Sequence, residues 1–351
     1  MNILWDFRLF SFGYRGRGVG AYALSMAKAI REAGCEARII IWGEKSSLPE
    51  DIRAWPVQWI DYVPRSWKSD LFIIPFIIIK YHIDIFHYWI ALGPLFRMGM
   101  GLFHSCKTCV TVHDIGVEYW DEVFHCVAVR KTWYWKIQKM LLPRVDSIVC
   151  NSSSTRADVE KLYKKGIKRK IHVLYPPVDY PDAVSAKKRD ARFLLLDGKE
   201  NKNTKAIIEG AQQFRQKHPH YSLVLLGGSD IDNCNLEGVT FEGMERYREL
   251  LAESAGLLFC SLHEGLGLPP LEAMARHCPL VLSDIPCLRE TCAEAGCFVD
   301  PRDMESIVRG MEDCALNNDE WVERSAQGAL RYERMSRNAG KQWIEIYKGL
   351  V

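Results

Sequence analysis

The chain has 351 residues, of which 48% are hydrophobic and 26% charged, and its net charge is +2. This ordinary globular composition excludes a disordered, collagen-like or coiled-coil protein, and the length suits two domains. Residues 1–175 hold 25 Lys and Arg against 16 Asp and Glu (+9), and the remainder holds 21 against 28 (−7). The basic half indicates either an anionic surface partner or chance scatter between two domains.

The first half of the chain alternates apolar strands with amphipathic helices, which predicts a parallel α/β architecture. We expect its strands at residues 3–5, 37–41, 83–87, 108–112, 147–150 and 172–174. We expect its helices at residues 20–32, 127–142 and 153–163. The last helix follows Asn151 and three serines, which form a good N-cap cluster.

An unusually apolar stretch, Leu71–Ile79, is interrupted by Pro75 and is too short to cross a bilayer. Lysine and aromatic residues flank it, and residues 130–136 with Lys139 form a second basic, aromatic segment. Two arrangements fit: a surface in the interface of an anionic membrane, or a buried helix beside a solvated cationic one. No nucleic-acid-binding module is recognisable, so we do not expect nucleic acid as a partner.

The cysteines, 12 in number, show no regular disulfide spacing, and Met1–Asp6 predicts a strand with no leader before it. Together these features predict a protein of the reducing cytosol. Cys106 and Cys109 form a CxxC pair that leads into an apolar run, and no second CxxC follows. We therefore expect buried thiols there rather than a zinc or redox site.

The proline-containing segment 175–182 is expected to join two domains. Beyond it the α/β alternation resumes, with strands expected at 193–196 and 222–226 and a helix at 204–217. The chain is expected to end in helices at residues 303–316, 320–335 and 339–348.

The most informative stretch of the chain is Ser261–Ala275, which has Glu264 and Glu272 on either side of a glycine turn. A buried strand is predicted before the turn, and a proline pair begins a helix after it. Free backbone amides and the positive end of a helix suit an anionic, phosphate-bearing ligand. The alternative is an ordinary βα unit with a charged cap.

The wider segment resembles the donor site of retaining glycosyltransferases of family 4. The matching pieces are residues 239–243, the E-x7-E segment, residues 279–283, Pro286, Glu290 and residues 299–301. The resemblance implies the α/β GT-B fold, two doubly wound Rossmann-like domains facing a cleft. Residues 1–175 would form the acceptor-side domain and residues 176–335 the donor-binding domain, with a terminal helix at about 336–351 returning to the first.

The loop at residues 15–22 follows the first strand, and Gly18 and Gly20 would let its backbone approach a pyrophosphate. In context it resembles the Gly-Ile-Gly-Arg-Tyr loop of bacterial polysaccharide mannosyltransferases within family 4. Asp6 and Arg8 also fit the opening of those proteins, whereas Ala21 stands where they carry arginine. The alternative is a purely structural turn.

His113 and Asp114 follow a buried strand at its carboxyl end, the usual ligand side of an open α/β sheet. The resemblance implies that His113 faces the transferred sugar and the acceptor. His113 would then donate to a sugar hydroxyl, and Asp114 would orient or deprotonate the acceptor hydroxyl. The alternative is a capping aspartate and a hydrogen-bonded histidine. We expect the other histidines, His87 among them, to serve packing or to lie on the surface.

The loop at residues 197–203 follows the first strand of the second domain. Family 4 places an arginine and a lysine here to neutralise the donor diphosphate. Lys202 and Asn203 match the family's Lys-Asn pair, but the loop has no arginine, and Lys199 would substitute as a point charge. By the same analogy three further residues flank the base and phosphates: Gly198, Gly227 and Phe241.

The resemblance also assigns roles within the E-x7-E segment: Glu264 lies by the sugar, and Glu272 binds the ribose hydroxyls. Backbone amides of the turn would contact sugar and phosphate, from Gly265, Leu266, Gly267 and Leu268. Leu266 and Cys278 replace the family's usual phenylalanine and glycine. Because both carboxylates lie on one βα unit, they do not form a glycosidase pair.

The resemblance implies catalysis with retention, without a protein nucleophile and without a metal ion or other cofactor. The catalytic set would be His113, Asp114, Lys202 and Glu264, with Lys202, Lys199 and backbone amides stabilising the leaving diphosphate.

The sequence therefore predicts a cytoplasmic glycosyltransferase that moves a hexose from a nucleotide sugar to a hydroxyl of a saccharide acceptor. The acceptor would be lipid-linked, in bacterial surface polysaccharide or lipopolysaccharide synthesis, and the enzyme would lie at the inner face of the membrane if the basic apolar surface is formed. The N-terminal loop alone favours GDP-mannose, and a UDP-hexose or a dTDP-deoxyhexose stays open as the donor. Two further readings stay open: a sugar-nucleotide epimerase of the same fold, and a catalytically silent nucleotide-sugar-binding subunit.

Overall fold

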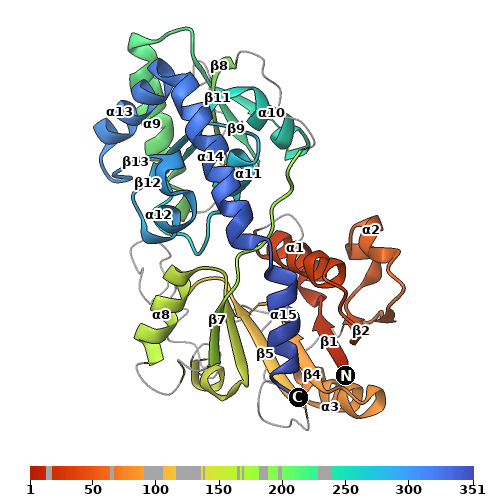
Figure 1. The fold of residues 1–351 in the computed structure, drawn as a ribbon. Helices are drawn as coiled ribbons and strands as arrows, with labels where there is room; N and C mark the ends of the chain where they lie inside the picture. The colour runs from red at the N-terminus through yellow and green to blue at the C-terminus, as the bar shows by residue number, and fades with distance from the viewer. Residues whose placement is uncertain are drawn as a thin grey trace. The chain divides into compact units, whose positions relative to one another are not determined.

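The computed structural model describes residues 1–12, 18–63, 67–90, 106–115, 136, 139–163, 167, 170–181, 189–196, 200–227, 239–242 and 244–351. The chain forms two compact units (Figure 1). Unit 1 comprises Met1–Tyr119, Cys126–Pro177 and Ser336–Val351, and unit 2 comprises Trp120–His125 and Val178–Met335.

Unit 1 is built on a seven-stranded sheet with the order β3-β2-β1-β4-β5-β6-β7, in which all neighbouring strands run parallel. The chain moves outward from β1 to β3 and then returns to build the other side from β4. The order thus reverses between β1 and β4, the kind of point where open α/β sheets bind ligands. The strands are β1 (Asn2–Asp6), β2 (Arg38–Trp42), β3 (Gln58–Ile60), β4 (Ile85–Tyr88), β5 (Lys107–Val112), β6 (Ser147–Cys150) and β7 (Ile171–Val173).

The described helices of unit 1 cover its sheet. They are α1 (Gly18–Glu32), α2 (Glu50–Arg53), α3 (Trp67–Tyr81), α8 (Ser153–Tyr163) and α15 (Ala339–Lys348), with short 3₁₀ turns at Arg8–Phe12, Lys45–Ser47 and Leu142–Arg144. The C-terminal helix α15 packs against α1, so the last residues of the chain complete the first unit (Figure 1). Most of the helix expected at 127–142 lies outside the described residues.

Unit 2 contains a six-stranded parallel sheet with the order β10-β9-β8-β11-β12-β13. Its strands are β8 (Asp190–Leu196), β9 (Ser222–Leu226), β10 (Val239–Glu242), β11 (Ser254–Phe259), β12 (Leu280–Ser283) and β13 (Gly296–Val299). Its helices are α9 (Thr204–Lys217), α10 (Tyr247–Glu253), α11 (Leu268–Met274), α12 (Pro286–Cys292), α13 (Met304–Leu316) and α14 (Asn318–Ser336), with 3₁₀ turns at Glu200–Lys202, Met244–Arg246 and Ala293–Ala295. Two parallel sheets flanked by helices confirm the predicted α/β class.

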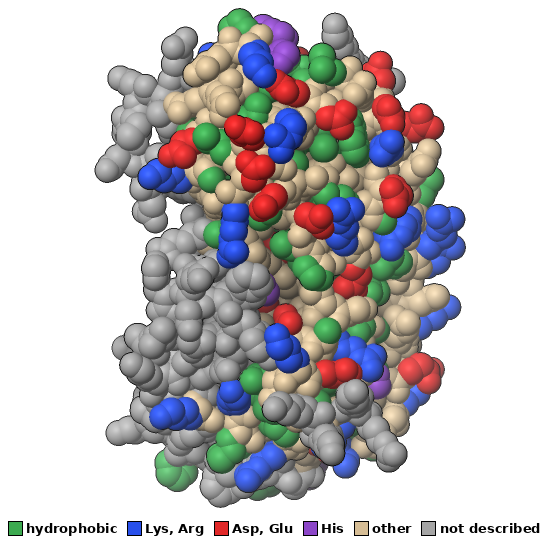
Figure 2. Space-filling model, turned by 90° about the vertical axis from the view of Figure 1, so that its left-hand side faces the viewer, with side chains coloured by type: hydrophobic (Ala, Val, Ile, Leu, Met, Phe, Trp, Pro, Cys, Tyr) green, Lys and Arg blue, Asp and Glu red, His purple; other side chains and the backbone are tan. Residues whose placement is uncertain are grey.

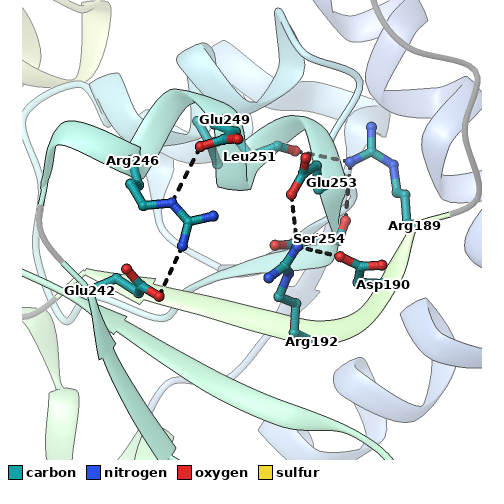
Figure 3. Close-up of polar contacts among 9 residues, drawn as sticks. All are labelled: Arg189, Asp190, Arg192, Glu242, Arg246, Glu249, Leu251, Glu253 and Ser254. Carbon is teal, nitrogen blue, oxygen red and sulfur yellow. Dashed lines mark hydrogen bonds and ion pairs between the residues drawn. The ribbon is translucent and has the colours of Figure 1, made fainter.

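Three arginines hold α10 in place on the sheet of unit 2 (Figure 3). The Arg189 guanidinium donates to the carbonyl oxygens of Leu251, in the last turn of α10, and of Ser254, just after it, at 2.9 and 3.1 Å. Carbonyl groups near a helix end lack intrahelical partners, so this arginine satisfies them. The other two form side-chain ion pairs: Arg192 with Asp190 and Glu253, and Arg246 with Glu242 and Glu249. Helix α10 is therefore a fixed support for the neighbouring α11.

The thiols Cys106 and Cys109 lie at β5, with Cys109 fully buried. Burial raises the pKa of each thiol to about 12, so both are protonated at neutral pH. The described cysteines are all free. Among the described residues, no group of three or more His, Cys, Asp or Glu side chains is placed to hold a metal ion.

A buried polar chain joins α15 to the sheet of unit 1 through His87. One ring nitrogen, Nδ1, lies 2.6 Å from the Tyr347 hydroxyl, and Nε2 lies 3.1 Å from Thr111 Oγ1. Trp5 Nε1 donates to the same Tyr347 hydroxyl at 3.2 Å. The ring packs against both Trp89 and Trp343, with centroids at 4.0 and 4.5 Å and tilted ring planes. His87 is thus a packing residue, as expected.

Burial makes the stability of unit 1 pH-dependent, because it lowers the pKa of His87 well below the ordinary value and also lowers that of His113. Below pH ~6.5 both histidines become protonated in the unfolded chain, whereas their rings stay neutral in the folded chain. The unfolding free energy should therefore fall from pH 6.5 to pH 5, by up to about 1.4 kcal/mol per pH unit for each histidine.

Urea unfolding between pH 7.5 and pH 5 measures this dependence. His87→Gln keeps one donor and one acceptor in the network, so it should fold and show a shallower slope over the same range. A slope equal to that of the wild type would exclude His87 as a source of the acid sensitivity.

Candidate active site

The predicted strand, turn and helix around Glu264 are present in unit 2. Strand β11 is buried along its whole length, and α11 begins after Gly267, which has a φ of +87°. A Cβ atom there would also meet Leu288 Cδ2 at 2.5 Å, so both the conformation and the space require glycine. Two prolines follow in the first turn of α11, where their missing N–H groups leave no helical bond unmade.

Two of the predicted catalytic side chains meet at this turn. Lys202 Nζ lies 2.6 Å from Glu264 Oε1, although the residues are 62 positions apart in the sequence. Both side chains are largely buried, at 24% and 14% exposed for Lys202 and Glu264. The ammonium group also lies 4.5 Å from the ring centroid of Phe259. A charge-assisted bond and an aromatic face therefore hold this cation at the carboxyl edge of the sheet.

The residues on either side of Lys202 bind the loop that carries Glu264. Asn201 Nδ2 donates to the His263 carbonyl at 3.3 Å, and the Leu262 amide donates to the Asn201 carbonyl at 2.8 Å. Asn203 has a φ of +58°, a conformation that asparagine tolerates better than most residues. Its Nδ2 donates to the carbonyls of Cys260 and Pro301, at 3.2 and 2.7 Å. Asn203 thus fixes the loop, and Lys202 carries the charge.

The second carboxylate, Glu272, lies on α11 close to the buried Tyr247 of α10, whose hydroxyl donates to the Pro269 carbonyl at 3.5 Å. Burial raises the pKa of Glu272 above its usual range, while Tyr247, Arg248 and Arg276 act in the opposite direction. A mostly buried carboxylate of this kind retains acceptor capacity for a ligand that brings donors.

A buried arginine ties the start of unit 2 to the same helix. Arg276 is 6% exposed, and its Nη1 donates to the carbonyls of Asp179 and Glu272 at 3.3 and 3.2 Å. The Asp179 carboxylate pairs with Arg248 Nη1 at 2.8 Å. Sequence patterns did not single out Tyr247, Arg248 or Arg276, because their importance depends on the packing of α10 against α11.

In unit 1, His113 follows β5 and is 8% exposed. Its Nε2 lies 2.8 Å from the Trp89 carbonyl oxygen, and its ring meets Tyr22 edge-on at 4.9 Å. Because a carbonyl only accepts, Nε2 carries the proton and Nδ1 is an acceptor in the neutral ring. Burial lowers the pKa of His113, so this neutral form dominates at neutral pH. Asp114, the next residue, is exposed.

Near the start of the chain, Asp6 and Arg8 lie together at the carboxyl end of β1. The guanidinium donates to both carboxylate oxygens, through Nε at 2.8 Å and Nη2 at 2.6 Å, and it stacks 3.6 Å from the Trp42 ring centroid. Both residues are buried, so this ion pair belongs to the packed carboxyl edge of the sheet. Gly18 and Gly20 lie in the first turn of α1, exposed and buried respectively.

The structure describes only some of the other predicted donor-site residues. Gly227 directly follows β9 and has a φ of +96°. Gly265, Leu266 and Leu268 lie in the turn before and at the start of α11. Phe241 lies in β10, but its side chain is outside the described part, as are Gly198 and Lys199 altogether.

Both units match known family models. Residues 16–180 match the model described as Glycosyltransferase Family 4, and residues 194–317 match the model described as Glycosyl transferases group 1. The chain therefore carries domains that match both glycosyltransferase models. These matches confirm the resemblance inferred from the E-x7-E segment.

Two curated relatives are mannosyltransferases of O-antigen synthesis. The O-antigen chain mannosyltransferase RfbU of Salmonella typhimurium is 26% identical over 246 residues, which are 63% of this chain and 67% of that protein. The O-antigen chain mannosyltransferase B of Escherichia coli is 30% identical over 163 residues, 42% of each protein.

Solved structures of glycosyltransferases share the fold over nearly the whole chain. HepE of Anabaena, in complex with UDP-glucose, matches with a TM-score of 0.76 at 15% identity and covers 100% of both chains. Sucrose-phosphate synthase of Thermosynechococcus elongatus matches with a TM-score of 0.75 at 18% identity, over 100% of this chain and 99% of that one. The fold is therefore GT-B, as predicted.

Proposed function

We propose that this glycosyltransferase moves a hexose from a nucleotide sugar to a hydroxyl group of a lipid-linked saccharide, in the cytoplasm, during synthesis of a bacterial surface polysaccharide. The observation that carries the proposal is the Lys202–Glu264 pair at the carboxyl edge of β11, with Glu272 on the helix that follows. The O-antigen relatives support the polysaccharide context.

Within unit 2, the proposed roles follow from charge. Loss of a nucleoside diphosphate leaves negative charge on the phosphate oxygens, and a preorganised ammonium group stabilises that charge as it develops. Lys202 supplies it, and Glu264 holds Lys202 in place and borders the sugar. Glu272 accepts hydrogen bonds from the ribose hydroxyls, for which its free acceptor capacity is suited.

The reaction proceeds with retention at the anomeric carbon and uses no protein nucleophile and no metal ion. Of the described carboxylates near the glycine turn, Glu264 is paired with Lys202, and Glu272 is mostly buried on α11, so both are better placed to bind the donor than to attack its anomeric carbon. His113 and Asp114 bind the acceptor side. Because the Nε2 proton of His113 faces the Trp89 carbonyl, the neutral ring offers Nδ1 as an acceptor for a sugar hydroxyl, in place of the donation expected from the sequence.

GDP-mannose is the donor that we propose. Its support is the N-terminal loop around Gly18 and Gly20 together with the two mannosyltransferase relatives. The structural neighbour HepE was solved with UDP-glucose, which makes a UDP-sugar the alternative donor.

A thermal-shift panel of GDP, UDP, dTDP and ADP tests the donor. A ligand that binds only the folded chain stabilises it by about 2.7 kcal/mol at 100 times its Kd, which raises the melting temperature by roughly 5–10 °C. We expect this shift with GDP. A shift with UDP or dTDP alone would replace the donor, and no shift with any nucleotide would contradict the proposed nucleotide-sugar site.

Glu272→Gln serves as the site control in the same panel. Glutamine keeps the size of the side chain, but it is a neutral partner for the ribose, so the GDP-induced shift should shrink. Without ligand its melting temperature at pH 7 should not fall, because burial opposes ionisation of the native carboxylate. Glu249→Gln, an exposed change on α10, should keep the full shift. A full shift in Glu272→Gln would remove Glu272 from the nucleotide site.

A further inference from the structure

Helix α3 has two apolar faces rather than one. Ile74, Ile77 and Ile78 are 1–3% exposed and form part of the core of unit 1. On the outer side Phe72, Phe76 and Ile79 are 78%, 60% and 69% exposed. Their spacing of four and then three residues places them on one stripe of the helix. Helix α3 is thus buried on one side, as one of the two arrangements expected from the sequence requires, and carries an exposed apolar stripe on the other.

A stripe of three bulky apolar side chains is unusual on a water-exposed helix. Single exposed hydrophobic residues are normal, and on the face shown in Figure 2 they lie scattered among charged side chains. Contiguous ones mark a surface that docks on something. Among the described residues no helix is long and apolar enough to cross a membrane, and α3 itself has 15 residues with Pro75 inside. Such a helix can instead lie in the plane of the membrane–water interface.

The end of α3 lies at a basic edge of the sheet. Asn2 Nδ2 donates to the carbonyls of Tyr81 and His82, at 3.2 and 2.9 Å, so α3 ends beside the amino end of β1. In a parallel sheet the amino ends of all strands share this edge. Several basic residues begin a strand or precede one there: Arg38, Lys107, Arg144 and Lys170.

One cation lies on the stripe itself. Lys80 is exposed, and its Nζ is 5.4 Å from the ring centroid of Phe76 and 5.3 Å from that of Tyr81. Two acidic groups of the same edge are engaged within the fold: Asp84 accepts from the Asn2 amide, and Asp146 pairs with Lys107. Glu36, two residues before β2, is exposed. Lys80 thus places positive charge directly on the stripe.

We propose that α3 docks unit 1 on an anionic lipid bilayer, with Phe72, Phe76 and Ile79 inserted at the acyl boundary and the basic edge against the headgroups. A second copy of the chain fits less well, since a two-fold contact on this stripe would bring Lys80 and its basic surroundings against themselves. Anionic lipid complements both the apolar stripe and the charge. His113 follows β5 at the opposite, carboxyl edge of the sheet and stays clear of the basic edge.

Vesicle sedimentation of the full chain tests this docking. The protein should pellet with phosphatidylglycerol–phosphatidylcholine vesicles at low salt, lose binding as salt rises, and bind pure phosphatidylcholine vesicles weakly. The double variant Phe72→Ser, Phe76→Ser should lose about 10-fold or more of the partition coefficient, because each ring contributes buried apolar area. The matched control is Leu316→Ser with Leu330→Ser, two side chains on unit 2 that are 73% and 60% exposed. It should bind as the wild type does.

Other outcomes would overturn the proposal. They are no pelleting of the wild type at low salt, or equal losses in the test and control variants. A third is a dimer in sedimentation velocity that the Phe72→Ser, Phe76→Ser variant converts to monomer, since a second copy would then cover the stripe. An unchanged melting temperature of each variant shows that the loss is not one of folding, and Lys80→Gln provides a milder variant if the double one is unstable.

Discussion

Replacing Glu264 by glutamine should lower kcat/KM for sugar transfer by about 10²–10³-fold while the protein stays folded. The carboxylate is 2.6 Å from Lys202 Nζ, and it is the charge that holds this ammonium group at the carboxyl edge of β11. Glutamine keeps the shape but not the charge, so the cation loses its anchor where the diphosphate leaves. Single-turnover kinetics with the donor identified by thermal shift measure the change.

The two side chains should act as a unit. Lys202→Met combined with Glu264→Gln should then cost little more than the more damaging single change, because each single variant already breaks the pair. The matched control is the exposed pair Lys205 and Glu209 on α9, whose charged atoms are 4.0 Å apart. Lys205→Met with Glu209→Gln should leave the rate unchanged. Near-wild-type turnover in Glu264→Gln would show that Glu264 is not part of the reaction site.

Most strands could be predicted because they are short apolar runs between turn residues. Strand β3 escaped prediction, since its three residues Gln58–Ile60 are only half-buried and include a polar one. The C-terminal helix α15 shows its apolar face in the spacing of Trp343 and Tyr347, but that pattern does not say which unit it covers. The family resemblance, and not the periodicity, supplied that expectation.

The site shows a similar limit. Residue types and spacing pointed to Glu264, Glu272 and Lys202 one at a time, but the contact of Lys202 with Glu264 arises from the pairing of β8 with β11, which brings their carboxyl-end loops together. Tyr247 belongs to no motif and became visible only once α10 was seen beside α11. Long-range contacts of this kind follow from strand order, which local patterns do not encode.

Replacing Gly340 by alanine should destabilise unit 1 by about 3 kcal/mol or more and lower its melting temperature by roughly 10 °C. Gly340 lies in the first turn of α15 where that helix crosses α1. A Cβ atom there would run directly into the Ala29 carbonyl oxygen and stand 3.0 Å from Ala33 Cβ. Backbone atoms cannot rotate away as a flexible side chain can, so the helices must separate.

Gly349→Ala is the matched control, because it lies just beyond the end of the same helix, where an added Cβ meets its nearest neighbour at an ordinary 3.4 Å. It should leave the melting temperature within about 1 °C of the wild type. Separation of α15 from α1 would also displace Tyr347 from His87, so the acid sensitivity of unit 1 should change in Gly340→Ala alone. Nucleotide binding by unit 2 should persist in both variants at temperatures below the transition. Equal stability of the two variants would mean that α15 does not rest on α1 through this glycine, and the link from the end of the chain to the β4–β5 core would have to lie elsewhere.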